Sequence, residues 1–259
     1  MDMGLSGKVA VVTGGSAGIG KGIVEMLLAE GCLVAACGRT KSKLDKLEAD
    51  LAAGDKLFTG VADTADAAAV NTFAANVADK FGGIDIWVNN AGIDGFEPLA
   101  DCSRDLWDNI IAVNLTGVWE CSKTAIRYMR KKKSGCIINI SSFTSVVPSA
   151  KIGAYSVTKS AVNALTRVMA GEIAPEGIRV NCVAPGMITT DLTEHQIEGK
   201  EEKLLSLIAL RRFGKPEDIA SCVVYLASDK SSYITGETIV VSGGKLLVQH
   251  PMDPWNNYR

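Results

Sequence analysis

A glycine-rich turn directly after an apolar run constrains this chain more than any other feature. Residues 9–12 are β-branched or small, and Thr13-Gly14-Gly15-Ser16-Ala17-Gly18-Ile19-Gly20 follows them before a helix-like segment to Glu30. Closely spaced glycines let the backbone turn sharply and approach an anion. The helix behind them directs unpaired N–H groups and its positive dipole end at the same point. The turn therefore predicts a phosphate-binding site between a strand and a helix.

The same residues partly fit the mononucleotide-binding loop G-x-x-x-x-G-K followed by Ser or Thr, through Gly15, Gly20 and Lys21. Residue 22 is glycine, however, and supplies no hydroxyl for a magnesium ion. A turn without any ligand is the other alternative, because glycines between a strand and a helix often only make a tight connection. We favour a dinucleotide site over both.

Short apolar runs alternate with amphipathic runs along the chain. We expect strands at 8–12, 32–37, 57–61, 84–88, 136–141, 179–183 and 238–241. We expect helices at 19–30, 41–51, 65–81, 104–130, 153–174 and 216–227. Such alternation with nearly continuous apolar strands is typical of a parallel sheet covered on both faces. The expected fold class is α/β, a Rossmann-like doubly wound parallel sheet of about seven strands in one domain, 1–259.

Composition narrows the class of protein further. With 259 residues, 47% hydrophobic residues and a formal net charge of −2, the chain suits one large globular enzyme and not a polyanion-binding protein. It shows no signal-peptide pattern and no apolar stretch long enough to span a membrane. The seven cysteines are scattered without a C-x-x-C pair, which indicates no metal or disulfide framework. We expect a cytoplasmic protein with a small-molecule substrate, no metal, and no nucleic-acid or membrane partner.

Glycine and polar residues follow most of the expected strands. Ligands gather outside the carboxyl ends of the strands in such a sheet. These residues should therefore meet at one site: the 13–20 turn, Gly38-Arg39, Asp63, Asn89-Asn90-Ala91-Gly92, Ser141-Ser142 and Pro185-Gly186.

Tyr155 and Lys159 lie four residues apart in an expected helix and hence on one face of it. An ammonium near a phenol favours the phenolate. We therefore expect Lys159 to lower the pKa of Tyr155 from about 10 toward the range of a general acid or base. Such a pair also arises by chance. Its position thirteen residues after Ser142, at the end of an expected strand, strengthens its interpretation as a catalytic pair.

These motifs and their order resemble the short-chain dehydrogenase/reductase family, in its branch with subunits of about 250 residues. Besides the 13–20 turn and 89–92, the resemblance rests on Asn114, Ser142, Tyr155 and Lys159, on Asn181-x-x-x-Pro185-Gly186, and on 212–218 and 233–236. It implies an oxidoreductase that interconverts a ketone and a secondary alcohol with a nicotinamide cofactor.

The resemblance also implies a role for each matching residue. Tyr155 would exchange a proton with the substrate oxygen, Ser142 would hydrogen-bond that oxygen, and Lys159 would hold the nicotinamide ribose. Asn114 would fix a water that relays protons to Lys159. The remaining expected cofactor contacts are Gly14, Ser16, Ala17, Gly18, Ile19, Gly20, Arg39, Asp63, Thr64, Asn90, Ala91, Gly92, Pro185, Gly186, Ile188 and Thr190.

The end of the second strand predicts the cofactor. NAD-dependent enzymes usually carry an acidic residue there for the ribose 2′-hydroxyl, but this chain has Gly38 followed by Arg39. A small residue leaves room for a 2′-phosphate, and a guanidinium binds it well. We expect NADP(H) to be preferred, with NAD(H) possible. The alternative is that Arg39 is a solvated loop charge or stacks on the adenine.

The least regular stretch, 187–212, resembles the family's flap over the substrate. Phe96, Ser142, Val147, Tyr155 and Met187 are the expected substrate contacts. His195, in the flap, is interpreted as a surface residue, with a substrate contact as the alternative.

The C-terminal tail, 245–259, runs beyond the usual end of the family and carries aromatic residues. We expect it to pack at a subunit interface of a homotetramer or homodimer.

The resulting hypothesis is a carbonyl or 3-oxoacyl-type reductase. The alternatives are a dehydrogenase of a sugar-like polyol or a sterol alcohol, and a nucleotide-binding scaffold without turnover. Because Asn114, Ser142, Tyr155 and Lys159 are all present, the scaffold is the weaker alternative. Enoyl reduction is disfavoured because relatives that perform it space the Tyr and Lys more widely.

Overall fold

The computed structural model describes residues 2–191, 193–245 and 247–257. Within these ranges, seven strands form one parallel sheet in the order β3-β2-β1-β4-β5-β6-β7. The strands are β1 (Val9–Thr13), β2 (Leu33–Gly38), β3 (Leu57–Val61), β4 (Ile86–Asn89), β5 (Gly135–Ile140), β6 (Ile178–Pro185) and β7 (Thr238–Val241). The predicted doubly wound sheet is confirmed, and its order reverses between β1 and β4, where such folds bind ligands.

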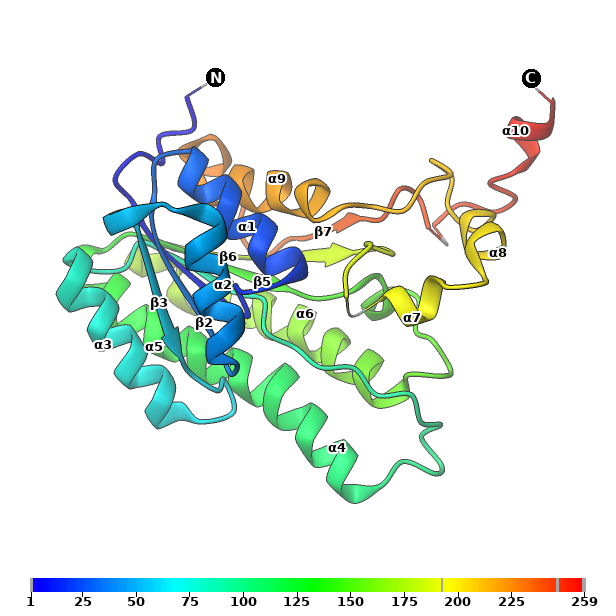
Figure 1. The fold of residues 1–259 in the computed structure, drawn as a ribbon, viewed down its shortest axis with the longest axis horizontal. Helices are drawn as coiled ribbons and strands as arrows, with labels where there is room; N and C mark the ends of the chain where they lie inside the picture. The colour runs from blue at the N-terminus through cyan, green and yellow to red at the C-terminus, as the bar shows by residue number, and fades with distance from the viewer. Residues whose placement is uncertain (1, 192, 246, 258–259) are drawn as a thin grey trace.

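Helices cover both faces of the sheet (Figure 1). One face carries α1 (Gly18–Ala29), α2 (Lys41–Leu51) and α9 (Pro216–Ala227). The other carries α3 (Ala67–Phe81), α5 (Gly117–Lys132) and α6 (Gly153–Ile173).

Each face has its own hydrophobic core, because successive side chains of a strand point to opposite sides. In β1, Ala10 and Val12 join Leu27 of α1 in one core, whereas Val9 and Val11 face the opposite one. All five residues of β1 are buried. This burial on both faces explains why β1 is a continuous apolar run in the sequence. The carboxyl end of β1 lies at the edge of the sheet where ligands bind in this fold.

The expected long helix at 104–130 is one nearly continuous helical segment with an irregular turn inside it. It comprises α4 (Arg104–Ile111), a π-helical turn (Ala112–Thr116) and α5. The turn carries Asn114, which is fully buried. Such single π turns occur mostly at functional sites, because they redirect a side chain without ending the helix.

The segment between β6 and α9 contains two short helices, α7 (Glu194–Ile197) and α8 (Glu201–Leu205). In Figure 1 both lie beyond the right-hand edge of the sheet. The tail contains α10 (Asp253–Asn257), which stands out past α8 (Figure 1). Trp255 donates its indole N–H to the carbonyl oxygen of Ala209 at 2.9 Å, so the tail follows the flap of its own chain. Residues 246 and 258–259 of the expected tail lie outside the described residues.

The described part of the chain contains no helix both long and apolar enough to cross a lipid bilayer.

Candidate active site

The glycine-rich turn joins β1 to α1, and two of its glycines leave no room for a side chain. A Cβ atom on Gly20 would lie 2.1 Å from the carbonyl oxygen of Gly14, and Gly14 itself has a φ of +63°. Both positions therefore require glycine. The turn presents backbone at the N-terminus of α1, which is the geometry that binds a pyrophosphate.

Asn90, directly after β4, holds this turn in place. Its side-chain amide donates to the carbonyl oxygens of Thr13 and Gly14 at 3.0 and 3.1 Å. The Thr13 hydroxyl in turn accepts from the backbone N–H groups of Asn90 and Ala91. The end of β4 and the phosphate turn thus form one hydrogen-bonded unit at the point where the strand order reverses.

A cleft of about 540 Å³ runs along this edge of the sheet. Its lining includes every residue predicted to contact the cofactor: Gly14, Ser16, Ala17, Gly18, Ile19, Gly20, Arg39, Asp63, Thr64, Asn90, Ala91, Gly92, Tyr155, Lys159, Pro185, Gly186, Ile188 and Thr190. The glycine cradle, the size of the cleft and the helix N-terminus fit a nicotinamide dinucleotide. Further lining residues are Gly38, Thr40, Lys43, Ala62, Ile93, Val113, Ile140, Ser141, Ser142, Asp191 and Thr193.

Lys43 is a cleft residue that the sequence interpretation missed. It lies in the first turn of α2, four residues after Arg39, and both line the cleft. Two cations at this end of the cleft suit a phosphate better than a neutral hydroxyl. The sequence signal for Lys43 was its position four residues after Arg39, because α2 begins immediately after Thr40 and its first turn lies beside Arg39.

Asn114 does not itself line the cleft within the described residues, but it lies directly behind the lining. Its side-chain oxygen accepts from the backbone N–H of Ile93 at 2.9 Å, and its amide donates to the carbonyl oxygen of Ile93 at 2.8 Å. Asn114 therefore clamps the backbone that follows β4. Its participation in a water relay stays a prediction.

Tyr155 and Ser142 meet across the cleft, from α6 and from the loop after β5. Burial raises the pKa of Tyr155 to about 12, although the hydrogen bond with Ser142 lowers it. The expected lowering of the phenol pKa by Lys159 is contradicted here, because burial raises this pKa and Lys159 is not among the groups that shift it. At neutral pH the phenol is protonated and can donate its proton.

Lys159 lies one turn after Tyr155, with its Nζ atom 5.5 Å from the centre of the phenol ring. The ammonium donates to the carbonyl oxygen of Ile140 at 2.9 Å. Burial lowers the pKa of Lys159 to about 8, because desolvation disfavours the charged form. A Cβ on Gly92 would lie 3.4 Å from this Nζ atom and 3.3 Å from Oδ1 of Asn114, so the 89–92 motif passes directly beside both side chains.

The predicted substrate contacts are only partly brought together. Ser142 and Tyr155 line the cleft, whereas Phe96, Val147 and Met187 are not among its described lining residues. Phe96 is 48% exposed and meets the flap through His195, whose ring lies edge-on at 5.5 Å between centroids. These three substrate contacts stay predictions.

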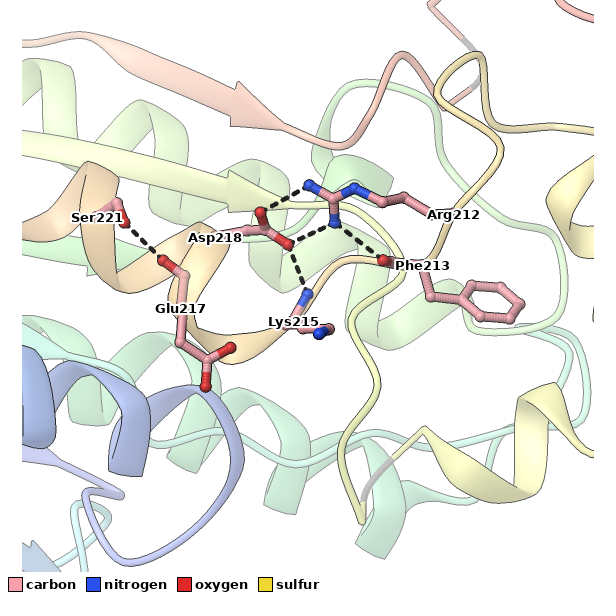
Figure 2. A network of polar contacts seen from close by, with 6 residues as sticks. All are labelled: Arg212, Phe213, Lys215, Glu217, Asp218 and Ser221. Carbon is pink, nitrogen blue, oxygen red and sulfur yellow. Dashed lines mark hydrogen bonds and ion pairs between the residues drawn. The ribbon is translucent and has the colours of Figure 1, made fainter.

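The flap is fastened at both ends. Its entry and exit pair through Gly214, which donates its N–H to the carbonyl oxygen of Met187 and accepts from the N–H of Thr189, both at 2.9 Å. At the exit, the guanidinium of Arg212 binds both carboxylate oxygens of Asp218 at 2.8 Å (Figure 2). Asp218 also accepts from the backbone N–H of Lys215 at 2.7 Å.

Comparison with known proteins identifies the relatives of this chain. The family model described as enoyl-(acyl carrier protein) reductase matches residues 14–245. The chain is 39% identical to the 3-oxoacyl-(acyl-carrier-protein) reductase FabG of Thermotoga maritima, over 95% of this chain and 100% of that one. It is 41% identical to the FabG of Staphylococcus aureus, over 93% and 98%.

Solved structures agree with this relationship. A structure described as a short-chain alcohol dehydrogenase from Sinorhizobium meliloti superposes with a TM-score of 0.89 at 38% identity, covering 93% of this chain and 97% of that one. A short-chain dehydrogenase/reductase from Brucella melitensis, described as glucose/ribitol dehydrogenase, gives a TM-score of 0.89 at 32% identity over 94% and 98%. The chain belongs to the short-chain dehydrogenase/reductase family and is an oxidoreductase that acts on CH–OH or C=O groups with NAD(P).

Proposed function

We propose that this protein reduces the ketone of a 3-oxoacyl-type substrate to a secondary alcohol, with NADPH as the preferred cofactor. The observation that carries the proposal is the meeting of Ser142, Tyr155 and Lys159 at one end of a dinucleotide cleft. The relatives named 3-oxoacyl-(acyl-carrier-protein) reductase support the substrate class.

The chain's own groups supply positioning and the proton. Ser142 hydrogen-bonds the carbonyl oxygen and polarises it, while the protonated phenol of Tyr155 donates a proton to that oxygen. Lys159 stabilises the developing phenolate and binds the ribose hydroxyls. The nicotinamide supplies the hydride that goes to the carbonyl carbon.

A ketone fits this arrangement better than an enoyl double bond. The phenol of Tyr155 and the hydroxyl of Ser142 converge on one point, where a carbonyl oxygen would accept from both. Tyr155 and Lys159 lie one helical turn apart in α6, whereas the family resemblance implies a wider spacing for enoyl reduction.

The cofactor preference is supported by Arg39 and Lys43, which both line the far end of the cleft. Neither has a carboxylate within ion-pair distance among the described residues, so both cations are available for a 2′-phosphate.

The assembly is also part of the proposal. We place residues 187–212 over the substrate as a flap, and we expect a homotetramer or homodimer in which the 245–259 tail reaches a subunit interface. Exposed Leu247 and Val248 in the tail support that placement, because apolar side chains favour a docking surface.

The test follows the absorbance of the nicotinamide at matched concentrations of NADPH and NADH. Acetoacetyl thioester is the ketone and crotonyl thioester is the enoyl comparison, with wild type and Tyr155→Phe assayed in parallel. Tyr233→Phe is the matched control, because Tyr233 is fully exposed.

We expect turnover of the ketone that favours NADPH, a loss of about 10²-fold or more in Tyr155→Phe, and no loss in Tyr233→Phe. Faster reduction of the crotonyl thioester would overturn the substrate assignment. Preference for NADH would overturn the cofactor assignment.

A further inference from the structure

The hydroxyl of Ser142 receives two hydrogen bonds from one residue, Thr144. Its Oγ atom accepts from the backbone N–H of Thr144 at 3.2 Å and from the Thr144 hydroxyl at 3.0 Å. Thr144 is only 1% exposed, so its hydroxyl needs a partner within the protein. Ser142 is that partner.

The bond from the backbone of Thr144 follows from the local fold. Ser142 precedes a single 3₁₀-helical turn, Phe143–Ser145, and its side chain caps that turn. Serine is a preferred cap because its oxygen accepts from an N–H group at the start of a helix. Such a cap uses one lone pair of the hydroxyl and needs no second donor. The bond from the Thr144 side chain therefore has another role.

The two bonds together determine what the Ser142 hydroxyl can still do. A serine hydroxyl can accept two hydrogen bonds and donate one. Because Thr144 fills both acceptor positions, the remaining capacity of Ser142 is the donation of its own proton. Ser142 lines the cleft together with Tyr155. The hydrogen bond with Ser142 lowers the pKa of Tyr155, as donation to the phenol oxygen would.

The neighbouring serine has the opposite arrangement. The hydroxyl of Ser141 donates its proton to the carbonyl oxygen of Lys159 at 3.0 Å. That proton is used within the protein and cannot serve a ligand at the same time. Of these two adjacent hydroxyls, the one that Thr144 contacts keeps its proton for the cleft.

The turn that carries Thr144 is fixed to α6. The side-chain amide of Asn163 donates to the Ser145 hydroxyl at 2.8 Å, and that hydroxyl donates to the carbonyl oxygen of Ser142 at 2.6 Å. These bonds hold the backbone of Ser142 but not the direction of its hydroxyl. The branched side chain of Thr144, which has few rotamers, supplies the bond that fixes this direction.

We propose that Thr144 is a positioning residue that makes the Ser142 hydroxyl a hydrogen-bond donor to the carbonyl oxygen of the substrate. Thr144 is not among the described lining residues of the cleft, so it acts through Ser142. The inference rests on the proposed function, because the donated bond strengthens as negative charge develops on a carbonyl oxygen. Without the Thr144 hydroxyl, Ser142 regains an acceptor position and its proton can turn away from the substrate.

The kinetics of acetoacetyl thioester reduction with NADPH test this role. Thr144→Val removes the hydroxyl and keeps a branched side chain of similar size, whereas Thr144→Ser keeps the hydroxyl. Thr124→Val is the matched control. Thr124 is also buried, at 3% exposed, and its hydroxyl donates to Asn71 between α3 and α5, away from the cleft.

We expect kcat to fall about 3- to 10-fold in Thr144→Val, the range for one neutral hydrogen bond. KM should stay within about twofold of wild type, because the lost bond acts mainly in the transition state. Thr144→Ser and Thr124→Val should keep a kcat within about twofold of wild type. A wild-type kcat in Thr144→Val, or an equal loss in Thr144→Ser, would overturn the inference.

A double-mutant cycle separates positioning from a general loss of structure. In a Ser142→Ala background, Thr144→Val should cause no further loss of the single-turnover rate at excess enzyme, because no Ser142 hydroxyl is left to orient. The same fractional loss with and without Ser142 would show that Thr144 acts on the fold alone, and would overturn the inference.

A measurement without substrate separates failure of this inference from failure of the proposed function. Neutron diffraction from wild-type crystals exchanged into heavy water locates the deuterium atoms of hydroxyl groups. A Thr144 deuterium directed at the Oγ atom of Ser142 supports the inference even if the thioester is not reduced. A Ser142 deuterium directed at Thr144 would reject the inference, and reduction of the thioester by the same protein would leave the proposed function standing.

Discussion

The Nζ atom of Lys159 donates a hydrogen bond to the carbonyl oxygen of Ile140 at 2.9 Å. Ile140 is the last residue of β5, immediately before Ser141-Ser142, so the bond ties the ammonium of α6 to the strand that leads into Ser142. The hydroxyl of Ser141 adds a second tie by donating to the carbonyl oxygen of Lys159 at 3.0 Å. Helix and strand therefore hold the proton-transfer groups in fixed register.

Reduction should decline with rising pH as Lys159 loses its charge. Burial lowers the pKa of Lys159 to about 8, so the side chain is fully protonated below about pH 7 and neutral above about pH 9. Because the ammonium stabilises the developing phenolate of Tyr155, kcat/KM for the ketone should be level at low pH and fall through about pH 8.

The variants test this fall in kcat/KM, which is called the break here. In Lys159→Met the activity should be low and the break absent. Lys230→Met, on an exposed turn, should keep the break, and a break near pH 8 in Lys159→Met would contradict the assignment.

Substitution of Gly20 should abolish cofactor binding. The added Cβ of Gly20→Ala would lie 2.1 Å from the carbonyl oxygen of Gly14, so the phosphate turn must move. Gly171→Ala in α6 is the matched control, because a Cβ there meets nothing within 4 Å. We expect Gly171→Ala to raise the free energy of unfolding by about 0.5–1 kcal/mol and to bind NADPH normally. Fluorescence titration of NADPH measures both variants, and normal affinity in Gly20→Ala would contradict the clash.

Loss of Asn114 should cost stability as well as activity. In Asn114→Ala both backbone groups of Ile93 lose a buried partner, so the free energy of unfolding should fall by about 2–4 kcal/mol. Urea denaturation measures this loss. Asn71→Ala, which removes a hydrogen-bonded amide from the more exposed surface between α3 and α5, should cost about 1 kcal/mol or less. Equal losses in the two variants would argue against the clamp.

Cofactor choice should depend on Arg39 and Lys43. Removing either cation should raise the KM for NADPH by about tenfold or more and change the KM for NADH much less, because a charge-assisted bond to the 2′-phosphate is lost. Lys46→Ala, in the same helix but paired with Asp50, is the control and should leave both constants unchanged. Equal increases for the two cofactors in Arg39→Ala would show that the guanidinium contacts the adenine and not a phosphate.

Sequence pattern predicted the sheet and the cofactor cleft well because both follow local rules. Apolar runs must form buried strands, and the residues at their carboxyl ends must share one edge. The 13–20 turn, Asn90 and Pro185 all line the cleft as expected. The π-helical turn at Asn114 was not predicted, because the 104–130 pattern reads as an uninterrupted helix.

Other features depend on three-dimensional packing and have no local signature. The raised pKa of Tyr155 follows from burial, which spacing to Lys159 cannot reveal. Asp94 reads as an ordinary loop carboxylate until its unpaired buried oxygen is seen. Phe96 and His195 are far apart in sequence, and only the folded flap brings their rings together.

The tie between Arg212 and Asp218 should control the mobility of the flap in a pH-dependent way. The hydrogen bond from Arg212 lowers the pKa of Asp218 to about 2, below its ordinary value of 3.8. The ion pair between Arg212 and Asp218 is therefore fully formed above about pH 4 and is lost as the pH falls from about 4 to 2. Because the pair is largely exposed, Asp218→Asn should reduce the free energy of unfolding by only about 0.5–1 kcal/mol.

The larger effect of Asp218→Asn should be local. At neutral pH, limited proteolysis within 190–213 should be faster than in wild type, because the flap exit loses its anchor to α9. Glu217→Gln is the matched control, since in Figure 2 no contact is drawn to the side chain of this neighbouring exposed residue and its backbone oxygen accepts from Ser221. Lowering the pH of wild type toward 2 should reproduce the fast cleavage of Asp218→Asn, monitored with an acid-stable protease. Cleavage of Asp218→Asn at the wild-type rate would mean that Gly214 and its pairing with Met187 hold the flap without help from the ion pair.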